Sequence, residues 1–165
     1  MGNPYISQAL ARERTRDLER DAARSRKAHD QVTAHLSSVR LFETCGKKEL
    51  RSIAKTAKIV TIHSGTQMIT EGDEGDSMYV ILAGSCRVAR NGRKLATLGP
   101  GASFGELCLL SKGPRTATVV AVTDIEAALI TRRQINGLLE KAPSFSRKLL
   151  EALSNMVRDL DKKVV

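Results

Sequence analysis

Aromatic residues are scarce in this sequence. Tryptophan is absent, and Tyr and Phe together account for 3% of the 165 residues. A hydrophobic core must therefore be built from Leu, Ile, Val and Ala. Proteins that bind single-stranded nucleic acid stack bases on exposed aromatic rings, so the scarcity also argues against that class of protein.

Cysteine is also sparse, and the three cysteines are widely spaced. Cys45, Cys86 and Cys108 are odd in number and contain no CxxC pair. This argues against both a disulfide framework and a zinc site, and it indicates a reducing, cytoplasmic compartment. The three histidines likewise show no metal-ligand spacing, so we expect no metal site.

Long apolar runs and catalytic motifs are missing as well. No segment approaches the length of a transmembrane helix, and the N-terminus has no signal-peptide pattern. No Ser/His/Asp set, paired-carboxylate site or P-loop occurs. We therefore predict a protein that is neither an enzyme nor an integral membrane protein.

Positive charge, by contrast, is in excess. The chain carries 27 Lys and Arg against 18 Asp and Glu, a formal net charge of +9. Such a balance can indicate binding to nucleic acid, an anionic membrane or an acidic protein. Here basic and acidic residues are interleaved without a block of five or six like charges, which favours solvated faces and disfavours DNA binding.

The N-terminal segment has a helical composition. Residues 5–40 contain neither Gly nor Pro and are rich in Ala, Arg, Glu and Asp. Leu18, Ala22, Val32 and Leu36 belong to a thin heptad-like stripe that Ser and His interrupt. Because a helix this polar is not stable alone, we expect it to dock on its own domain, a second copy or a partner. A mobile charged arm is the alternative.

The middle of the chain predicts many short strands. After a short helical segment at 41–58, runs rich in Val, Ile and Thr alternate with Gly- and Asp-rich turns. Asn91-Gly92 between two such runs indicates a β-hairpin. The expected strands are Lys58–His63, Gln67–Thr70, Met78–Ala83, Cys86–Arg90, Lys94–Leu98, Thr116–Val122 and Ile125–Ile130. This spacing favours a sandwich or a jelly-roll barrel.

The last segment is expected to be helical again. Thr131 and Gln134 have the spacing of a capping box, which begins a helix that runs to about Lys141. Ala142-Pro143 ends it, and a longer helix follows from Ser144. The predicted fold is thus α+β, a jelly-roll β-barrel (double-stranded β-helix) flanked by an N-terminal helical segment and two C-terminal helices. We divide it into a charged extension, 1–35, and one domain, 36–165.

One segment of the predicted barrel has the residues that an anion site needs. Gly105 allows close approach of backbone, and a short helix after it would direct free N–H groups toward a phosphate. Arg115 can offer forked donors to phosphate oxygens, and Thr116 adds a hydroxyl. Glu106 can accept a hydrogen bond from a ribose hydroxyl. An ordinary loop with an Arg–Glu structural salt bridge is the alternative.

The segment FGELCLLSKGPRTATV, residues 104–119, closely resembles the phosphate-binding cassette of cyclic-nucleotide-binding domains. Such domains occur in protein kinase A regulatory subunits, cyclic-nucleotide-gated channels and catabolite-activator-type regulators. The resemblance extends over about residues 36–163. The cassette departs from the family pattern only at Cys108, where a small residue such as Ala is common.

The resemblance implies a set of ligand-binding residues. Glu106 should accept the ribose 2′-hydroxyl, and Arg115 should pair with the cyclic phosphate. The remaining candidates are Phe104, Gly105, Leu107, Cys108, Thr116 and Ala117 in the cassette, with Val88 and Leu95 against the base. Because the family closes its pocket with the C-terminal helix, the lid candidates are Met156, Leu160, Lys163 and Val164. A stripe of dimer or core contacts is the alternative for these four.

The resemblance leaves the nucleotide open. The Arg115-Thr116 pair occurs in cGMP-preferring relatives and also in channels that respond to cAMP, and we favour cAMP. Because the sequence ends at Val165 without a helix-turn-helix, we expect a stand-alone receptor that acts on a protein partner or as a homodimer through its N- and C-terminal helices. The alternatives are an assembly subunit that uses the domain as a scaffold, and the sensory half of a transcription regulator.

Overall fold

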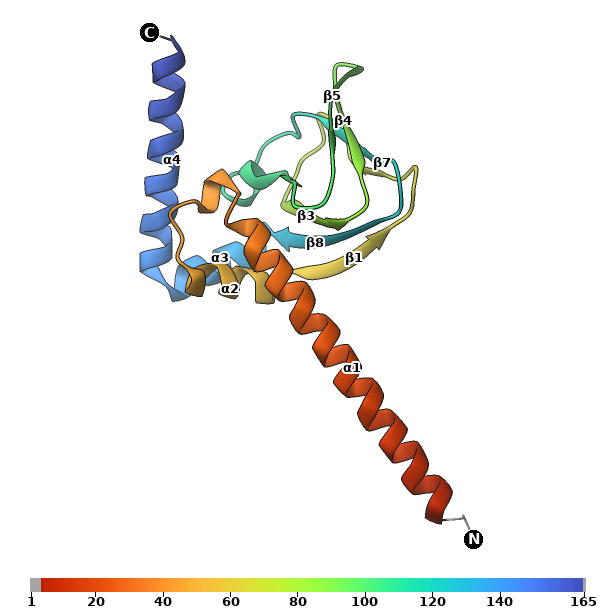
Figure 1. The fold of residues 1–165 in the computed structure, drawn as a ribbon. Coiled ribbons are helices and arrows are strands. Elements are labelled where there is room, and N and C mark those ends of the chain that lie inside the picture. The colour runs from red at the N-terminus through yellow and green to blue at the C-terminus, as the bar shows by residue number, and fades with distance from the viewer. Residues whose placement is uncertain (1–3, 165) are drawn as a thin grey trace.

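A computed structural model describes residues 4–164 of the chain (Figure 1). Helices at both ends flank a β-roll. The helical elements are α1 (Pro4–Leu36), η1 (Arg40–Phe42), α2 (Lys47–Thr56), η2 (Glu106–Leu109), α3 (Arg132–Lys141) and α4 (Pro143–Val164). The strands are β1 (Lys58–Ile62), β2 (Gln67–Ile69), β3 (Ser77–Ala83), β4 (Cys86–Arg90), β5 (Arg93–Leu98), β6 (Ser103–Phe104), β7 (Thr118–Ala121) and β8 (Ile125–Thr131).

The strands form two antiparallel sheets. One has the order β1-β8-β3-β6 and the other the order β2-β7-β4-β5. Strands that are distant in sequence are neighbours in both sheets, as the pairing of Tyr79 with Phe104 and of Val88 with Val119 shows. The prediction of an α+β jelly roll between helical segments is therefore confirmed.

The sheet β1-β8-β3-β6 separates two hydrophobic cores. On its outer face Met78, Val80 and Ile130 pack against the helices, and on its inner face Ile81 and Ala127 fill the roll. Strands β3 and β8 thus bury both faces, which is why their sequences are continuously apolar and do not alternate. This sheet connects the interior of the roll with the helical layer.

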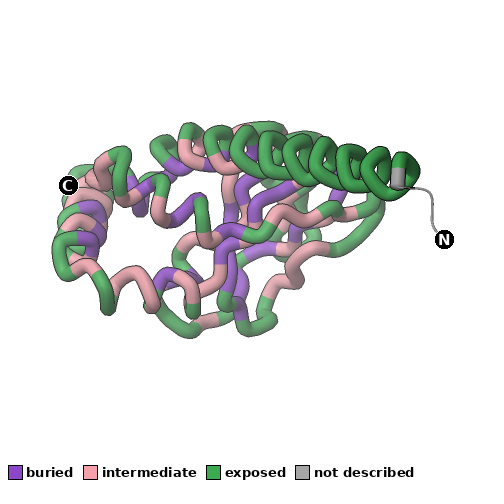
Figure 2. The backbone as a smooth tube through the Cα atoms, turned by 90° about the horizontal axis from the view of Figure 1, so that it is seen from below, coloured by how far each residue is buried: buried purple, intermediate pink, exposed green. Residues whose placement is uncertain are grey.

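Helix α1 is packed only near its C-terminal end. Ala28, Val32 and Leu36 are buried, whereas every residue from Tyr5 to Lys27 is exposed. In Figure 1 the exposed part extends away from the roll, and in Figure 2 it is green over its outer length. The packed part of the chain thus begins inside α1, at Ala28, before the helix ends at Leu36.

The C-terminal helices follow the predicted signals. Thr131 caps α3: its Oγ1 accepts from the Gln134 N–H at 3.3 Å, and the Thr131 N–H donates to Oε1 of Gln134 at 2.9 Å. Pro143 begins α4, where its missing N–H breaks no helical hydrogen bond. None of the helices in residues 4–164 is long and apolar enough to cross a membrane.

Most predicted boundaries agree with the structure to within one residue, and three segments differ more. The segment 41–58 divides into η1 and α2, and its last residue, Lys58, begins β1. Strand β6 was not predicted, because two residues carry no periodicity. Strand β7 begins at Thr118 and not at Thr116, so Thr116 and Ala117 remain in the loop that lines the candidate site.

Candidate functional site

Gly105 turns the chain sharply at the beginning of η2. Its φ of 87° and ψ of 10° lie in the left-handed region, which favours glycine. The turn connects β6 with η2, whose first N–H groups have no partners inside so short a helix. Phe104, just before the turn, stacks on Tyr79 with the ring centroids 5.2 Å apart, and this fixes the entry of the chain.

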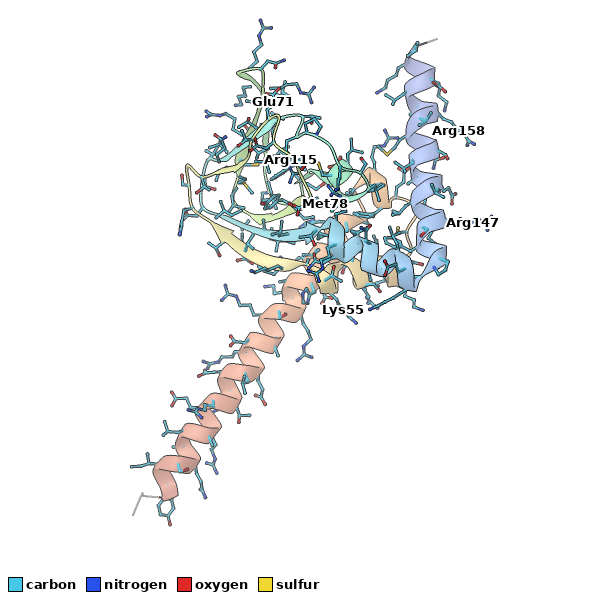
Figure 3. The ribbon with its side chains drawn as sticks, turned by 180° about the vertical axis from the view of Figure 1, so that it is seen from behind. Lys55, Glu71, Met78, Arg115, Arg147 and Arg158 are labelled. Carbon is cyan, nitrogen blue, oxygen red and sulfur yellow. The ribbon has the colours of Figure 1, made fainter. Side chains whose placement is uncertain are left out.

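Arg115 is buried inside the roll, although its guanidinium carries a charge (Figure 3). Its Nη1 donates to the Ser77 carbonyl at 2.7 Å, and its Nη2 donates to the Ser77 hydroxyl at 3.1 Å. No ion pair joins Arg115 to a carboxylate within the described part of the chain. Burying an unpaired charge is costly, so the site favours an anion beside Arg115.

Two glycines make room for this guanidinium. A Cβ at Gly105 would lie 2.5 Å from Nη1 of Arg115 and 2.7 Å from the Ser77 carbonyl oxygen. A Cβ at Gly75 would also collide with the Arg115 side chain. The backbone around Arg115 is fixed as well, because its N–H donates to the Asp73 carbonyl at 2.7 Å. Arg115 is therefore held in place by backbone on several sides.

Glu106 is the first residue of η2 and is half-buried. Its carboxylate has no hydrogen-bond or ion-pair partner among residues 4–164, so the Arg–Glu salt bridge considered for this segment is not formed. A free acceptor thus lies close in sequence to an unpaired cation. This arrangement suits a ligand that combines an anionic group with a hydroxyl donor.

A cavity of about 270 Å³ connects these groups. This volume is just below the range of about 300–1,000 Å³ that is typical of small-molecule sites. All ten residues predicted to bind the ligand line the cavity: Val88, Leu95, Phe104, Gly105, Glu106, Leu107, Cys108, Arg115, Thr116 and Ala117. The roll therefore brings together side chains from β4, β5, η2 and the loop before β7.

The sequence prediction missed part of the site. Ser77, which holds Arg115, follows no motif that could have identified it. Ile69, Ser103 and Val119 also line the cavity. Arg90 is another lining residue, and strand alternation two positions after Val88 could have placed it there.

The four lid candidates lie elsewhere. Met156, Leu160, Lys163 and Val164 are on the last turns of α4 and do not line the cavity. In Figure 1 this end of α4 stands apart from the roll. Leu160 and Val164 are 60% and 87% exposed. In this arrangement α4 contributes no residue to the lining of the cavity.

A protein-family comparison gives one match that spans half of the chain. The model described as "Cyclic nucleotide-binding domain" matches residues 59–142, which include the whole cassette. The match begins in β1 and ends between α3 and α4.

Two curated relatives have cAMP in their descriptions. A cAMP-dependent protein kinase regulatory subunit of Yarrowia lipolytica is 41% identical over 81 residues, 49% of this chain and 22% of that protein. A CRP-like cAMP-activated global transcriptional regulator of Mycobacterium tuberculosis is 27% identical over 74% of this chain and 57% of its own length. The chain thus spans less than two thirds of either relative.

Solved structures share the fold. The N-terminal domain of a transcriptional regulator from Streptomyces coelicolor superimposes with a TM-score of 0.71 and 29% identity, covering 78% of this chain and 95% of that one. The Thermus thermophilus catabolite activator protein gives a TM-score of 0.61 and 30% identity, covering 76% of this chain and 62% of that one.

Proposed function

Because this chain belongs to the cyclic nucleotide-binding domain family, we propose that its cavity is a receptor site for a 3′,5′-cyclic nucleotide. The observation that carries the proposal is Arg115, a buried guanidinium without a carboxylate partner in residues 4–164. A cyclic phosphate is a diester with one negative charge, and the planar fork of arginine suits its oxygens.

The remaining groups fit the rest of such a ligand. The unpaired carboxylate of Glu106 accepts the ribose 2′-hydroxyl, and the apolar side chains of Val88 and Leu95 pack against the base. We propose cAMP as the ligand and cGMP as the alternative. The relatives named above support cAMP, since the kinase subunit is described as cAMP-dependent and the transcriptional regulator as cAMP-activated.

We further propose that binding is transmitted through the helices to a protein partner or a second copy of the chain. The exposed part of α1 and the end of α4 offer solvent-exposed surfaces for this purpose. The ligand must then bind one arrangement of the helices better than another. In such a mechanism α4 moves toward the cavity and its last turns act as a lid.

The ligand assignment is tested by calorimetric titration of the protein with cAMP and with cGMP, beside Arg115→Ala. Removing one member of a buried charge pair costs about 2–5 kcal/mol, or about thirtyfold to several-thousandfold in affinity. Arg87→Ala is the matched control, because Arg87 is exposed on β4 and does not line the cavity.

We expect the wild type and Arg87→Ala to bind cAMP at micromolar concentration or below, and Arg115→Ala to bind far more weakly. Circular dichroism and thermal unfolding of each variant separate loss of binding from loss of fold. If the folded wild type binds neither nucleotide, the receptor proposal fails. The scaffold role, in which the exposed part of α1 anchors an assembly, then takes its place.

A further inference from the structure

A second cation lies at the mouth of the cavity, beyond the one that the cyclic phosphate requires. Arg90 is the last residue of β4 and lines the cavity together with Val88. Alternate residues of a strand face the same side, so Arg90 continues the inward row of β4. Because Arg90 is exposed while Arg115 is buried, Arg90 lies at the mouth of the cavity.

One hydrogen bond orients the side chain of Arg90. Its Nε donates to the Thr116 carbonyl at 2.7 Å, across the cavity rim from β4 to the end of the cassette. The hairpin that carries it is also fixed, since the Asn91 N–H donates to the Glu71 carboxylate at 2.9 Å. In Figure 3 Glu71 lies nearer to the hairpin tip than Arg115 does.

The terminal nitrogens of Arg90 are free for a ligand. Neither has a hydrogen-bond or ion-pair partner among the residues that the structure describes. A guanidinium is a rigid planar fork, so the hydrogen bond from Nε also restricts the directions of the terminal N–H groups. Arg90 therefore presents preorganised donors at the mouth, where no donor is needed for the phosphate.

The proposed ligand places its base near these donors. With the phosphate on Arg115 and the ribose on Glu106, the base lies along Val88 and Leu95, next to Arg90. Guanine offers two adjacent acceptors, O6 and N7, which arginine pairs with bidentately. Adenine offers N7 beside an amino group. The amino group is a hydrogen-bond donor, so it cannot accept a hydrogen bond from a guanidinium.

We propose that Arg90 is a specificity-determining residue that improves the binding of guanine relative to adenine at the outer end of the cavity. The inference rests on the proposed function. It concerns how much Arg90 contributes to the affinity for each nucleotide, and not which nucleotide binds more tightly overall.

The test measures three affinities by calorimetry, those of cAMP, cGMP and cyclic IMP, for the wild type, Arg90→Ala and Arg90→Lys. Cyclic IMP keeps O6 and N7 but lacks the amino group of guanine. Arg93→Ala is the control, because Arg93 pairs with Arg90 across the hairpin, is exposed and does not line the cavity.

We expect Arg90→Ala to weaken cGMP and cyclic IMP about fivefold or more relative to cAMP, from the loss of one bidentate pair. Arg90→Lys should show the same change in ratio, because it keeps the charge and loses the fork. Loss of general electrostatic attraction, or a looser cassette, lowers all three affinities together and leaves the ratios unchanged. Arg93→Ala should leave the ratios unchanged as well.

Three results overturn the inference. If the wild type binds the nucleotides and the ratios do not change in Arg90→Ala, Arg90 has only a structural or steering role. If cGMP weakens but cyclic IMP does not, the contact is to the amino group and not to O6 and N7. If the folded wild type binds none of the three, the proposed function fails and the inference fails with it.

Discussion

Gly105 shows how one backbone conformation supports the whole binding site. Gly65 and Gly105 share a left-handed conformation, with φ of 83° and 87°. They differ in surroundings: a Cβ at Gly65 would have nothing within 4 Å, whereas a Cβ at Gly105 would meet Arg115 and Ser77. The two glycines therefore separate the effect of backbone strain from the effect of crowding at the site.

We predict that Gly65→Ala lowers the free energy of unfolding by about 1–2 kcal/mol, the cost of the left-handed conformation. Gly105→Ala should lower it further, because its Cβ would also lie 2.7 Å from the Ser77 carbonyl oxygen. Only Gly105→Ala should also lose affinity for the cyclic nucleotide, because its methyl group displaces the Arg115 guanidinium. Urea unfolding and calorimetry on both variants measure the two effects. Full binding by Gly105→Ala would show that the position of Arg115 is not critical.

Among the secondary-structure elements, α1 changes its environment along its length. Leu18 and Leu36 belong to the same heptad-like stripe, yet Leu18 is 70% exposed and Leu36 is fully buried in the core between the helices and the sheet. The hydrophobic pattern in the sequence is the same at both positions. Packing against α2 and the sheet β1-β8-β3-β6 distinguishes them.

We predict that Leu36→Ala lowers the free energy of unfolding by about 2–5 kcal/mol, the usual range for a buried leucine. Leu18→Ala should change it by less than about 0.5 kcal/mol at micromolar protein concentration. Urea unfolding at several protein concentrations measures both. A destabilisation of Leu18→Ala that grows with protein concentration would contradict this prediction and show that the exposed part of α1 self-associates.

On the scale of the whole molecule, the ion pair between Lys148 and Glu49 joins distant parts of the helical layer. Lys148 on α4 donates to the carboxylate of Glu49 on α2 at 2.6 Å, and the two side chains are 33% and 19% exposed. This hydrogen bond is the main reason why the pKa of Glu49 lies below its ordinary value of 4.5. A depressed carboxyl pKa stabilises the fold above the unfolded pKa, and this stabilisation is lost as the pH falls through the folded pKa.

We predict that Glu49→Gln lowers the free energy of unfolding at pH 7 by on the order of 1 kcal/mol. The difference from the wild type should narrow as the pH falls below 4.5 and the carboxyl becomes protonated in both states. Urea unfolding of both proteins between pH 3 and pH 7 measures this difference in the free energy of unfolding. Glu140→Gln, at an exposed position on α3, is the control and should show no such pH dependence. A constant difference at all pH values would mean that packing, and not charge, is what Glu49 contributes.

The cavity and most of the helices lie on opposite faces of the sheet β1-β8-β3-β6. A direct connection between them runs through Arg132 at the beginning of α3. Its Nε donates to the Cys108 carbonyl of η2 at 2.8 Å, and its guanidinium also donates to the Gly75 carbonyl. A ligand that shifts η2 therefore acts on the first turn of α3, which precedes α4.

The sequence by itself determined the local structure of this protein and the chemistry of its site. Gly- and Asp-rich turns set the strand lengths, Thr131 and Gln134 set the beginning of α3, and the cassette residues carried the resemblance to the family. These features depend on neighbours a few residues apart, and local backbone preferences suffice to specify them.

Only the tertiary structure decided which side chains meet across the roll. Ser77 holds Arg115 from 38 residues away, and Arg90 reaches Thr116 from 26 residues away. Tertiary structure also decided that the stripe on α1 is buried at Leu36 and exposed at Leu18. Strand order and helix docking bring such residues together, and both follow from packing between segments whose separation in the sequence carries no periodic signal.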